Sequence, residues 1–190
     1  MSCPDQSSPQ ASAPRERILA AARALFAEAG LQAASLRGIA ARAGYTPAAL
    51  YFHFPSREAI YAELLRDSLG ALRDALADAR DFRAAAMALF DFYAARPQDL
   101  SLGLYLGLGG LAPRGLGADL DPALNALLLE AMMPLTREAR ALGDETLAAQ
   151  AFAQVVGLVI LAETRRLRLF APEARPLMQA HLDALLRGRA

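Results

Sequence analysis

Helix-breaking residues divide this sequence into segments rich in Ala, Leu and Arg, which are strong helix formers. Runs in which β-branched residues alternate with polar ones, the usual pattern of strands, do not occur in the sequence. Prolines, glycines and capping residues therefore mark the ends of helices. The chain is predicted to be all-α, with about nine helices.

The N-terminal segment, residues 1–14, is rich in Ser, Pro and Gln and lacks an apolar stretch. Such a composition is typical of a disordered tail and not of a targeting signal. Pro14 and Gly30 are then expected to bracket the first helix. Because Cys3 is the single cysteine and no signal is recognisable, the expectation is a cytoplasmic protein without disulfides.

Two short helices separated by a tight turn are predicted between residues 35 and 54. Ser35 is expected to cap the first of them, and Gly44 to turn the chain. Thr46 is expected to cap the second, which Pro55 ends. This is a helix-turn-helix arrangement, in which the second helix presents one face to the major groove of DNA.

The second of these short helices has an unusual outward face. Leu50 and Phe54 lie four residues apart and are expected to face the core. The residues left on the outside and at the flank are small or aromatic: Ala48, Ala49, Tyr51 and Phe52. Such a face is odd on a solvated surface, but small side chains allow close approach to bases in a groove.

Charge is balanced over the whole chain and uneven along it. All 20 basic residues are arginine, which is typical of a GC-rich bacterial genome, and 20 acidic residues offset them. This balance excludes a protein that holds nucleic acid by bulk charge. Between Pro14 and Arg66, seven arginines against four glutamates leave a net charge of 7 − 4 = +3. The excess favours phosphate, but tight binding to DNA would need a dimer.

Residues 15–66 resemble the DNA-binding domain of TetR/AcrR-type regulators. The resemblance rests on Ile18-Leu19-Ala20-Ala21-Ala22, Leu25-Phe26, Gly30, Ser35-Leu36-Arg37, Ile39-Ala40, Ala43-Gly44, Thr46, Leu50-Tyr51-Phe52-His53-Phe54 and Arg57-Glu58. The family often carries lysine where Arg57 stands, a difference that preserves phosphate contact. The residues that the resemblance assigns to DNA are Arg37, Thr46, Pro47, Ala48, Ala49, Tyr51, Phe52, His53 and Arg57.

The resemblance implies different roles within this set. Tyr51, His53 and Arg57 are expected to contact phosphates, while Thr46 to Ala49 and Phe52 face bases or sugars. Arg37 is expected to reach the DNA backbone or a base edge. Structural alternatives remain open, in which Tyr51 is a half-buried packing residue, His53 lies at the edge of the core, and Arg37 is solvated.

The remaining residues, 67–190, are predicted to form a helical bundle for effector binding and dimerisation. Residues 148–162 are apolar on almost every side, so their helix is expected to be buried on two sides. The resemblance implies that one side faces a twofold partner together with the last helix; the alternative is a thick monomeric core. The predicted interface comprises Val156, Gly157, Ile160, His181, Leu182 and Leu185. The most apolar stretch, 155–162, is far shorter than the roughly 20 residues that a membrane helix needs, so no membrane partner is expected.

Soft and aromatic side chains on the middle helices are candidates for an effector pocket, although the same residues suit an ordinary core. They are Met87, Phe90, Tyr93, Leu104, Tyr105, Met132 and Met133, with Gln154 as a polar contact. The glycine-rich stretch 107–117 is expected to be a loop, and Pro134 to kink a helix over 121–142. With two histidines far apart in sequence, neither a metal nor a cofactor is expected.

These features predict a homodimeric, ligand-responsive regulator of transcription, most simply a repressor. It would bind a palindromic operator in double-stranded DNA and be released by a small, mostly apolar effector. An enzyme such as a small helical hydrolase is the first alternative, but His53 lacks a nearby acid partner and no nucleophile elbow is present. The second alternative is a helical module that binds small molecules or lipids without binding DNA.

Overall fold

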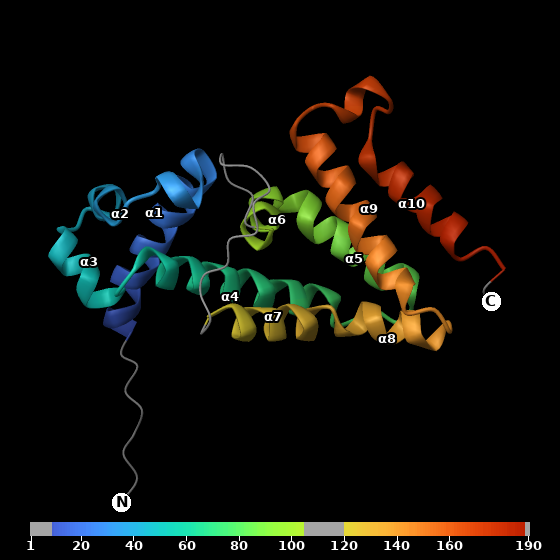
Figure 1. The fold of residues 1–190 in the computed structure, drawn as a ribbon, viewed down its shortest axis with the longest axis horizontal. Coiled ribbons are helices and arrows are strands. Elements are labelled where there is room, and N and C mark those ends of the chain that lie inside the picture. The colour runs from blue at the N-terminus through green and yellow to red at the C-terminus, as the bar shows by residue number, and fades with distance from the viewer. Residues whose placement is uncertain (1–8, 105–119, 189–190) are drawn as a thin grey trace, which may run out of the picture. The chain divides into compact units, whose positions relative to one another are not determined.

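The computed structural model describes residues 9–104 and 120–188, and every regular element within them is helical (Figure 1). The elements are α1 (Pro9–Ala33), α2 (Leu36–Ala43), α3 (Pro47–His53), α4 (Arg57–Leu76), α5 (Phe82–Ala95), α6 (Pro97–Gly103), α7 (Leu120–Ala131), α8 (Met133–Ala141), α9 (Thr146–Glu163), a 3₁₀ turn η1 (Leu167–Leu169) and α10 (Ala174–Leu185). The prediction of an all-α chain is confirmed.

The described residues divide into two compact units, 9–65 and 66–104 with 120–188. The boundary falls inside α4, so this helix contributes residues to both units. The division comes close to the predicted end of the first domain at residue 66. A single continuous helix therefore links two separately packed cores.

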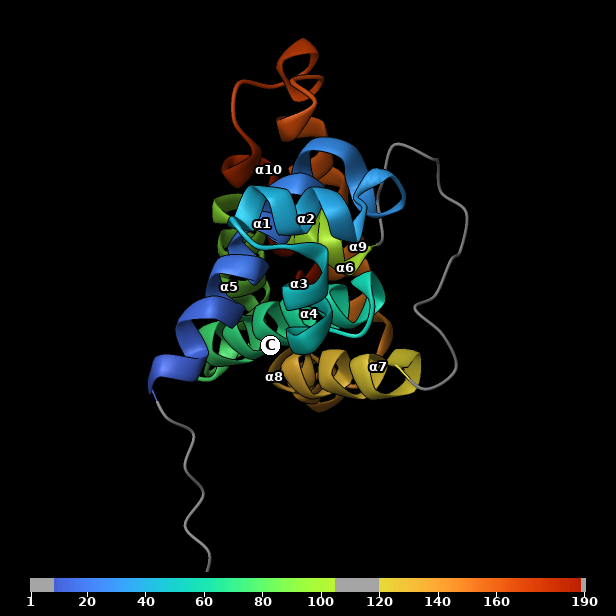
Figure 2. The same cartoon turned by 90° about the vertical axis from the view of Figure 1, so that its left-hand side faces the viewer.

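The first unit contains α1, α2 and α3, with α2 and α3 toward the viewer in Figure 2. Its core includes Ile18, Ile39 and Leu50, which are fully buried. The first helix is longer than predicted, because it begins at Pro9 and continues to Ala33. Pro14 thus lies inside a helix, and residues 9–14 of the expected tail are helical. Pro14 removes one backbone hydrogen bond near the start of an alanine-rich segment, which does not stop the helix.

The predicted helix caps in this unit are confirmed. The hydroxyl of Ser35 accepts from the Gly38 N–H at 3.0 Å, and the hydroxyl of Thr46 accepts from the Ala49 N–H at 3.2 Å. Gly44 ends α2 with a φ of 76°, in the left-handed region that favours glycine. The turn between α2 and α3 is therefore fixed by local chemistry at both of its ends.

The second unit is built around α5, which packs against α6, α8, α9 and α10. Its fully buried side chains include Leu89, Leu135, Leu147 and Met178. Two exposed ion pairs join α5 to α10, Arg83 with Asp183 and Arg175 with Asp91. Exposed pairs of this kind contribute roughly 0–1 kcal/mol each, so burial of apolar side chains dominates the stability of the unit.

Two predicted helices of the second unit were too long. The helix expected over 121–142 is split into α7 and α8, with Pro134 in the first turn of α8, where its missing N–H costs nothing. This break, in place of a kink, makes ten α-helices in the described residues. The sequence also predicts that the apolar helix begins after Asp144 and runs to about Phe170; it ends at Glu163, and Arg165 then adopts a φ of 58°. The stretch 107–117 lies outside the described residues.

The apolar helix α9 is longer than the stretch 155–162, whose shortness was the reason to expect no membrane partner. It has 18 residues with a mean hydropathy of 1.6, and by length and composition alone it could cross a membrane. Core helices of soluble proteins have the same composition, and its inner side is buried, including Ala151, Val155 and Val159. Only 33% of it is buried within the chain, so an apolar outer side remains.

Candidate nucleic-acid interface and effector cavity

The outward face of α3 is set by its helical register. Leu50 is fully buried and Phe54 is 2% exposed, as predicted. In contrast, Tyr51 is 55% exposed and Phe52 is 89% exposed, and Ala48 is exposed beside them. Two large aromatic side chains thus stand in solvent on a seven-residue helix. Their orientation is confirmed, while their contact with DNA stays a prediction.

Arg15 on α1 holds the end of α3 in place. Its guanidinium donates to the carbonyl of His53 at 3.0 Å and to a carboxylate oxygen of Glu63 on α4 at 2.5 Å. The same group lies 4.4 Å from the centre of the Phe54 ring, within the range of a cation–π contact. One side chain therefore joins α1, α3 and α4 within the first unit. Sequence reasoning treated Arg15 only as part of the basic excess.

His53 is half-buried at the end of α3. Its ring packs edge-to-face against Tyr45 and Phe52, with ring centres 6.4 Å and 5.6 Å away. This position leaves part of the imidazole at the surface next to the exposed aromatic residues. It suits both the expected phosphate contact and the alternative of a histidine at the core edge.

The basic excess of the first unit is only partly available to a ligand. Arg42 donates two hydrogen bonds of 2.7 Å to Glu28, and these bonds, with the arginine charge, lower the pKa of the Glu28 carboxyl. Arg57 donates to Glu58 at 2.8 Å, so a phosphate would compete with that carboxylate. Arg37 is exposed on α2 and makes no hydrogen bond or ion pair with any described residue. Of the two arginines in the helix-turn-helix, Arg42 is held by Glu28 and Arg37 keeps its guanidinium exposed.

The residues predicted to line an effector pocket differ in their exposure within the described part of the chain. Phe90, Tyr93 and Met132 are buried in the core of the second unit. Burial, and then the charge of Asp99, raises the pKa of Tyr93 to about 12, so its hydroxyl stays protonated. Met133 is 62% exposed and does not face that core. The remaining candidates are Met87, Leu104 and Gln154, which are half-buried, and Tyr105, which lies outside the described residues.

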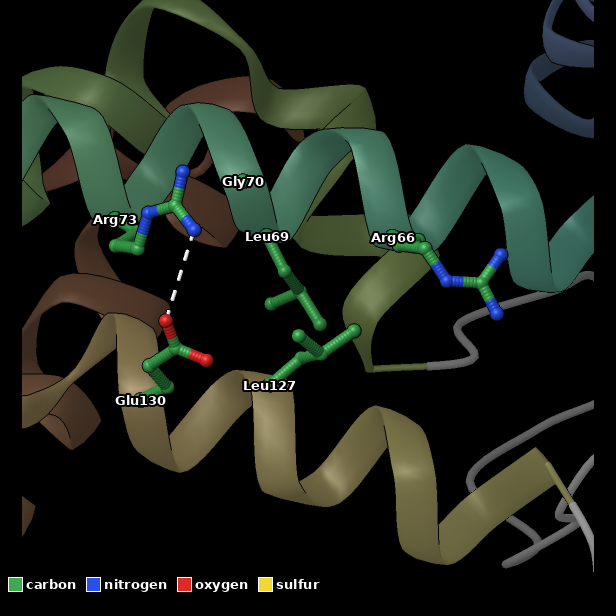
Figure 3. A pocket seen from close by; sticks show the side chains of 6 residues that line it. All are labelled: Arg66, Leu69, Gly70, Arg73, Leu127 and Glu130. Carbon is green, nitrogen blue, oxygen red and sulfur yellow. Dashed lines mark ion pairs between the residues drawn. The ribbon is translucent and has the colours of Figure 1, made fainter. Parts of the chain in front are cut away.

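A cavity of about 110 Å³ lies between α4 and α7, within the second unit (Figure 3). Its lining comprises Arg66, Leu69, Gly70, Arg73, Leu127 and Glu130. The four residues from α4 stand at i, i+3, i+4 and i+7, so they share one face of the helix. Arg73 and Glu130 form an ion pair of 3.6 Å across the cavity. The sequence signal that could have found this site is a glycine between two arginines on one helical face.

Most of the residues predicted to form the dimer interface are at least partly accessible on the surface of the single chain. Val156 and Ile160 are half-buried on α9, and Gly157 between them is exposed. On α10, Leu185 is half-buried, as is His181, whose buried Nε2 has no hydrogen-bond partner among the described residues. Leu182, in contrast, is fully buried within its own subunit, because it lies one helical turn after Met178 on the inner side of α10. It cannot contribute to an interface as predicted.

Comparison with known proteins gives sequence matches for the first unit, which contains the helix-turn-helix. Residues 18–64 match the sequence profile described as "Bacterial regulatory proteins, tetR family". The HTH-type transcriptional repressor KstR2 of Rhodococcus jostii (strain RHA1) is 42% identical over 79 residues, which are 40% of this chain and 39% of that protein. The matched segment of this chain thus spans about two fifths of the length of that curated relative.

Solved structures show the fold over almost the whole chain. The regulatory protein SCO4313 superposes with a TM-score of 0.76 at 22% identity, covering 94% of this chain and 99% of that one. The SmeT–triclosan complex has a TM-score of 0.64 at 26% identity and covers 91% of both chains. Both units of this chain therefore have their counterparts in the fold of these solved structures. Residues 18–64 therefore match the sequence of TetR-type bacterial regulatory proteins, and the chain as a whole shares the fold of these solved structures.

Proposed function

We propose that this protein is a homodimeric, ligand-responsive transcriptional regulator, most simply a repressor, that acts on DNA in the cytoplasm. The observation that carries the proposal is the outward face of α3, where Tyr51 and Phe52 stand exposed beside Ala48 on a helix with capped ends. Exposed apolar side chains that lie together mark an interaction surface, and on a helix in the major groove small residues allow close approach while apolar ones can contact thymine methyls.

On DNA, the N-terminal part of α3 would lie in the major groove. The methyl groups of Ala48 and Ala49 are suited to contacts with thymine methyls, and Thr46 and Pro47 begin the helix beside them. Tyr51, and His53 next to it, would contact phosphates and so fix the register without reading sequence. Arg37 and Arg57 would add phosphate contacts from the flanking helices.

Dimerisation supplies the second half of the binding site. The outer side of α9 is apolar around Gly157, and α10 carries Leu185 and His181 beside it. Pairing of these two helices with their symmetry mates would cover the apolar surface that the single chain leaves exposed. A twofold dimer binds two half-sites about 34 Å apart, which is why a palindromic operator is expected.

The effector would bind in the second unit and act through α4, the helix that both units share. A ligand releases DNA only if it prefers the state in which the two α3 helices no longer match successive grooves. The structural relative in complex with triclosan supports a small, mostly apolar effector for this chain.

Binding to the DNA upstream of its own gene tests the proposal. We expect a saturable complex in fluorescence anisotropy, with affinity falling on the order of a thousandfold between 50 and 200 mM salt for about six phosphate contacts. The reason is release of counterions from the neutralised phosphates. Affinity that does not depend on salt, or absence of any complex, would favour instead a helical small-molecule or lipid-binding module.

Substitutions on α3 should separate phosphate contacts from base contacts. Tyr51→Phe removes one exposed hydroxyl, and we expect operator and non-operator DNA to lose about tenfold in affinity alike, since hydrogen bonds to charged groups contribute about 1.5–3 kcal/mol. Ala48→Asn should instead change which bases are preferred. Both effects are measured by anisotropy against a set of single-base operator variants. A change of preference in the Tyr51 variant without loss of affinity would reverse the two roles.

A further inference from the structure

We propose that the cavity between α4 and α7 binds a small carboxylate, with the apolar body of the ligand against Leu69 and Leu127 and its carboxylate on Arg66. The role of this ligand as an effector rests on the proposed function, whereas its binding does not. The inference adds a charge to an effector that the sequence described only as apolar.

The size of the cavity limits what it can hold. Its volume of about 110 Å³ is well below the roughly 300–1,000 Å³ of pockets for drug-sized ligands. The space exists because Gly70 has no side chain, and a Cβ built there would meet no atom within 4 Å. A glycine inside a helix costs about 1 kcal/mol of stability relative to alanine. At Gly70 the absence of a side chain leaves the cavity open. The occupant is therefore a short chain or a single ring.

The charges around the cavity select an anion. Two arginines and one glutamate line it. Arg73 is already engaged, with Asp74 at 3.0 Å and with Glu130 at 3.6 Å. Arg66 is exposed and makes no hydrogen bond or ion pair within the described part of the chain. Its guanidinium presents a planar set of donors that matches a carboxylate in a two-point contact. Figure 3 shows Arg66 and Arg73 on α4, on either side of Leu69.

A carboxylate in this place would act on the contact between α4 and α7. The Arg73–Glu130 pair joins these two helices across the cavity, and a ligand body against Leu69 and Leu127 would lie beside that pair. Arg66 is also the first α4 residue of the second unit. Ligand binding would therefore change how α7 holds the part of α4 that continues into the DNA-binding unit.

Titration calorimetry on the full chain tests the site, with hexanoate as the probe and hexanamide as its uncharged counterpart. We expect hexanoate to bind at least tenfold more tightly than hexanamide, and Arg66→Gln to remove that difference. Gly70→Leu should abolish binding of both, because its side chain would fill the cavity without a backbone clash. Arg168→Gln, which changes an exposed arginine of η1, is the control and should bind hexanoate like the parent protein.

The proposal is overturned if hexanoate and hexanamide bind alike, if neither binds, or if Arg66→Gln and Arg168→Gln give the same result. A gel shift on the upstream DNA then separates the site from the function. Release of DNA by hexanoate from the parent protein, but not from Arg66→Gln, supports the effector role. Binding of hexanoate without release overturns that role and leaves the site, whereas failure of the free protein to bind DNA overturns the proposed function alone.

Discussion

Gly157→Glu is expected to give a folded, largely monomeric protein that no longer binds its operator. Gly157 is exposed on α9 between the half-buried Val156 and Ile160, and an added Cβ meets nothing within 4 Å in the single chain. The subunit itself should tolerate the change, and replacing a glycine inside a helix is favourable by up to about 1 kcal/mol. The substitution should therefore weaken dimerisation and leave the stability of the folded subunit unchanged or slightly higher.

The loss of association follows from charge burial. In the proposed dimer this position would face an apolar surface and lie near its own symmetry mate, so the new carboxylate would be buried without a partner. Burying an unpaired charge costs several kcal/mol, and each ~1.4 kcal/mol weakens dimerisation about tenfold. A monomer carries a single α3 and half of the phosphate contacts, so operator binding should collapse although the first unit is intact.

Light scattering and a gel shift on the same sample measure both effects. Ala94→Glu is the matched control, because it adds the same charge to an exposed position of α5. It should leave mass and DNA affinity unchanged. A Gly157 variant that stays dimeric would place the interface on another surface, and a monomeric variant that binds the operator tightly would remove dimerisation from the mechanism.

The helix-turn-helix could be predicted from sequence because its determinants are local. Ser35, Gly44 and Thr46 each act on backbone groups within a few residues, and the structure shows the caps and the left-handed turn where these residues stand. The four-residue spacing of Leu50 and Phe54 fixes which side of α3 is buried. Residue types and short spacings therefore determine both the motif and its exposed face.

The cavity was not predicted, because its lining comes from two helices far apart in sequence and depends on which side chains leave the space between them unfilled. Arg66 and Gly70 on α4 meet Leu127 on α7 only in the packed structure. Methionine and aromatic residues were predicted to line a pocket, whereas Phe90 and Tyr93 are buried in the core of the second unit and do not line the cavity between α4 and α7. Sequence patterns find apolar faces but not the gaps between them.

The predicted positions of helix ends were also wrong where a residue type is compatible with more than one local structure. Pro14 was expected to begin a helix and lies inside one, while Pro134 was expected to bend a helix and begins a new one. Proline is compatible with each outcome, and the surrounding packing decides between them. Leu182 shows the same limit for interfaces, since an apolar residue on α10 suits the core of its own subunit as well as a partner.

Phe54→Ala is expected to destabilise the first unit by about 3–5 kcal/mol, the range for a buried phenylalanine replaced by alanine. The Phe54 side chain is 2% exposed, and its ring also carries the guanidinium of Arg15 at 4.4 Å. Its loss would leave a cavity beside α3 and remove one side of the contact that lets Arg15 reach the His53 carbonyl and Glu63. Urea unfolding followed by circular dichroism measures the change, which should appear in the transition of the first unit and not in that of the second.

Phe52→Ala provides the matched control, since it is the same substitution two residues earlier on the same helix. Phe52 is 89% exposed, so its removal takes almost no apolar surface out of a core, and we expect a change in stability within about 0.5 kcal/mol. The two variants should therefore lose DNA binding for different reasons. Phe54→Ala destabilises the first unit and loses DNA binding as a consequence, whereas Phe52→Ala stays folded and weakens DNA binding directly. Equal losses of stability would mean that Phe52 is packed in solution, and the outward face of α3 on which the proposed function depends would not exist.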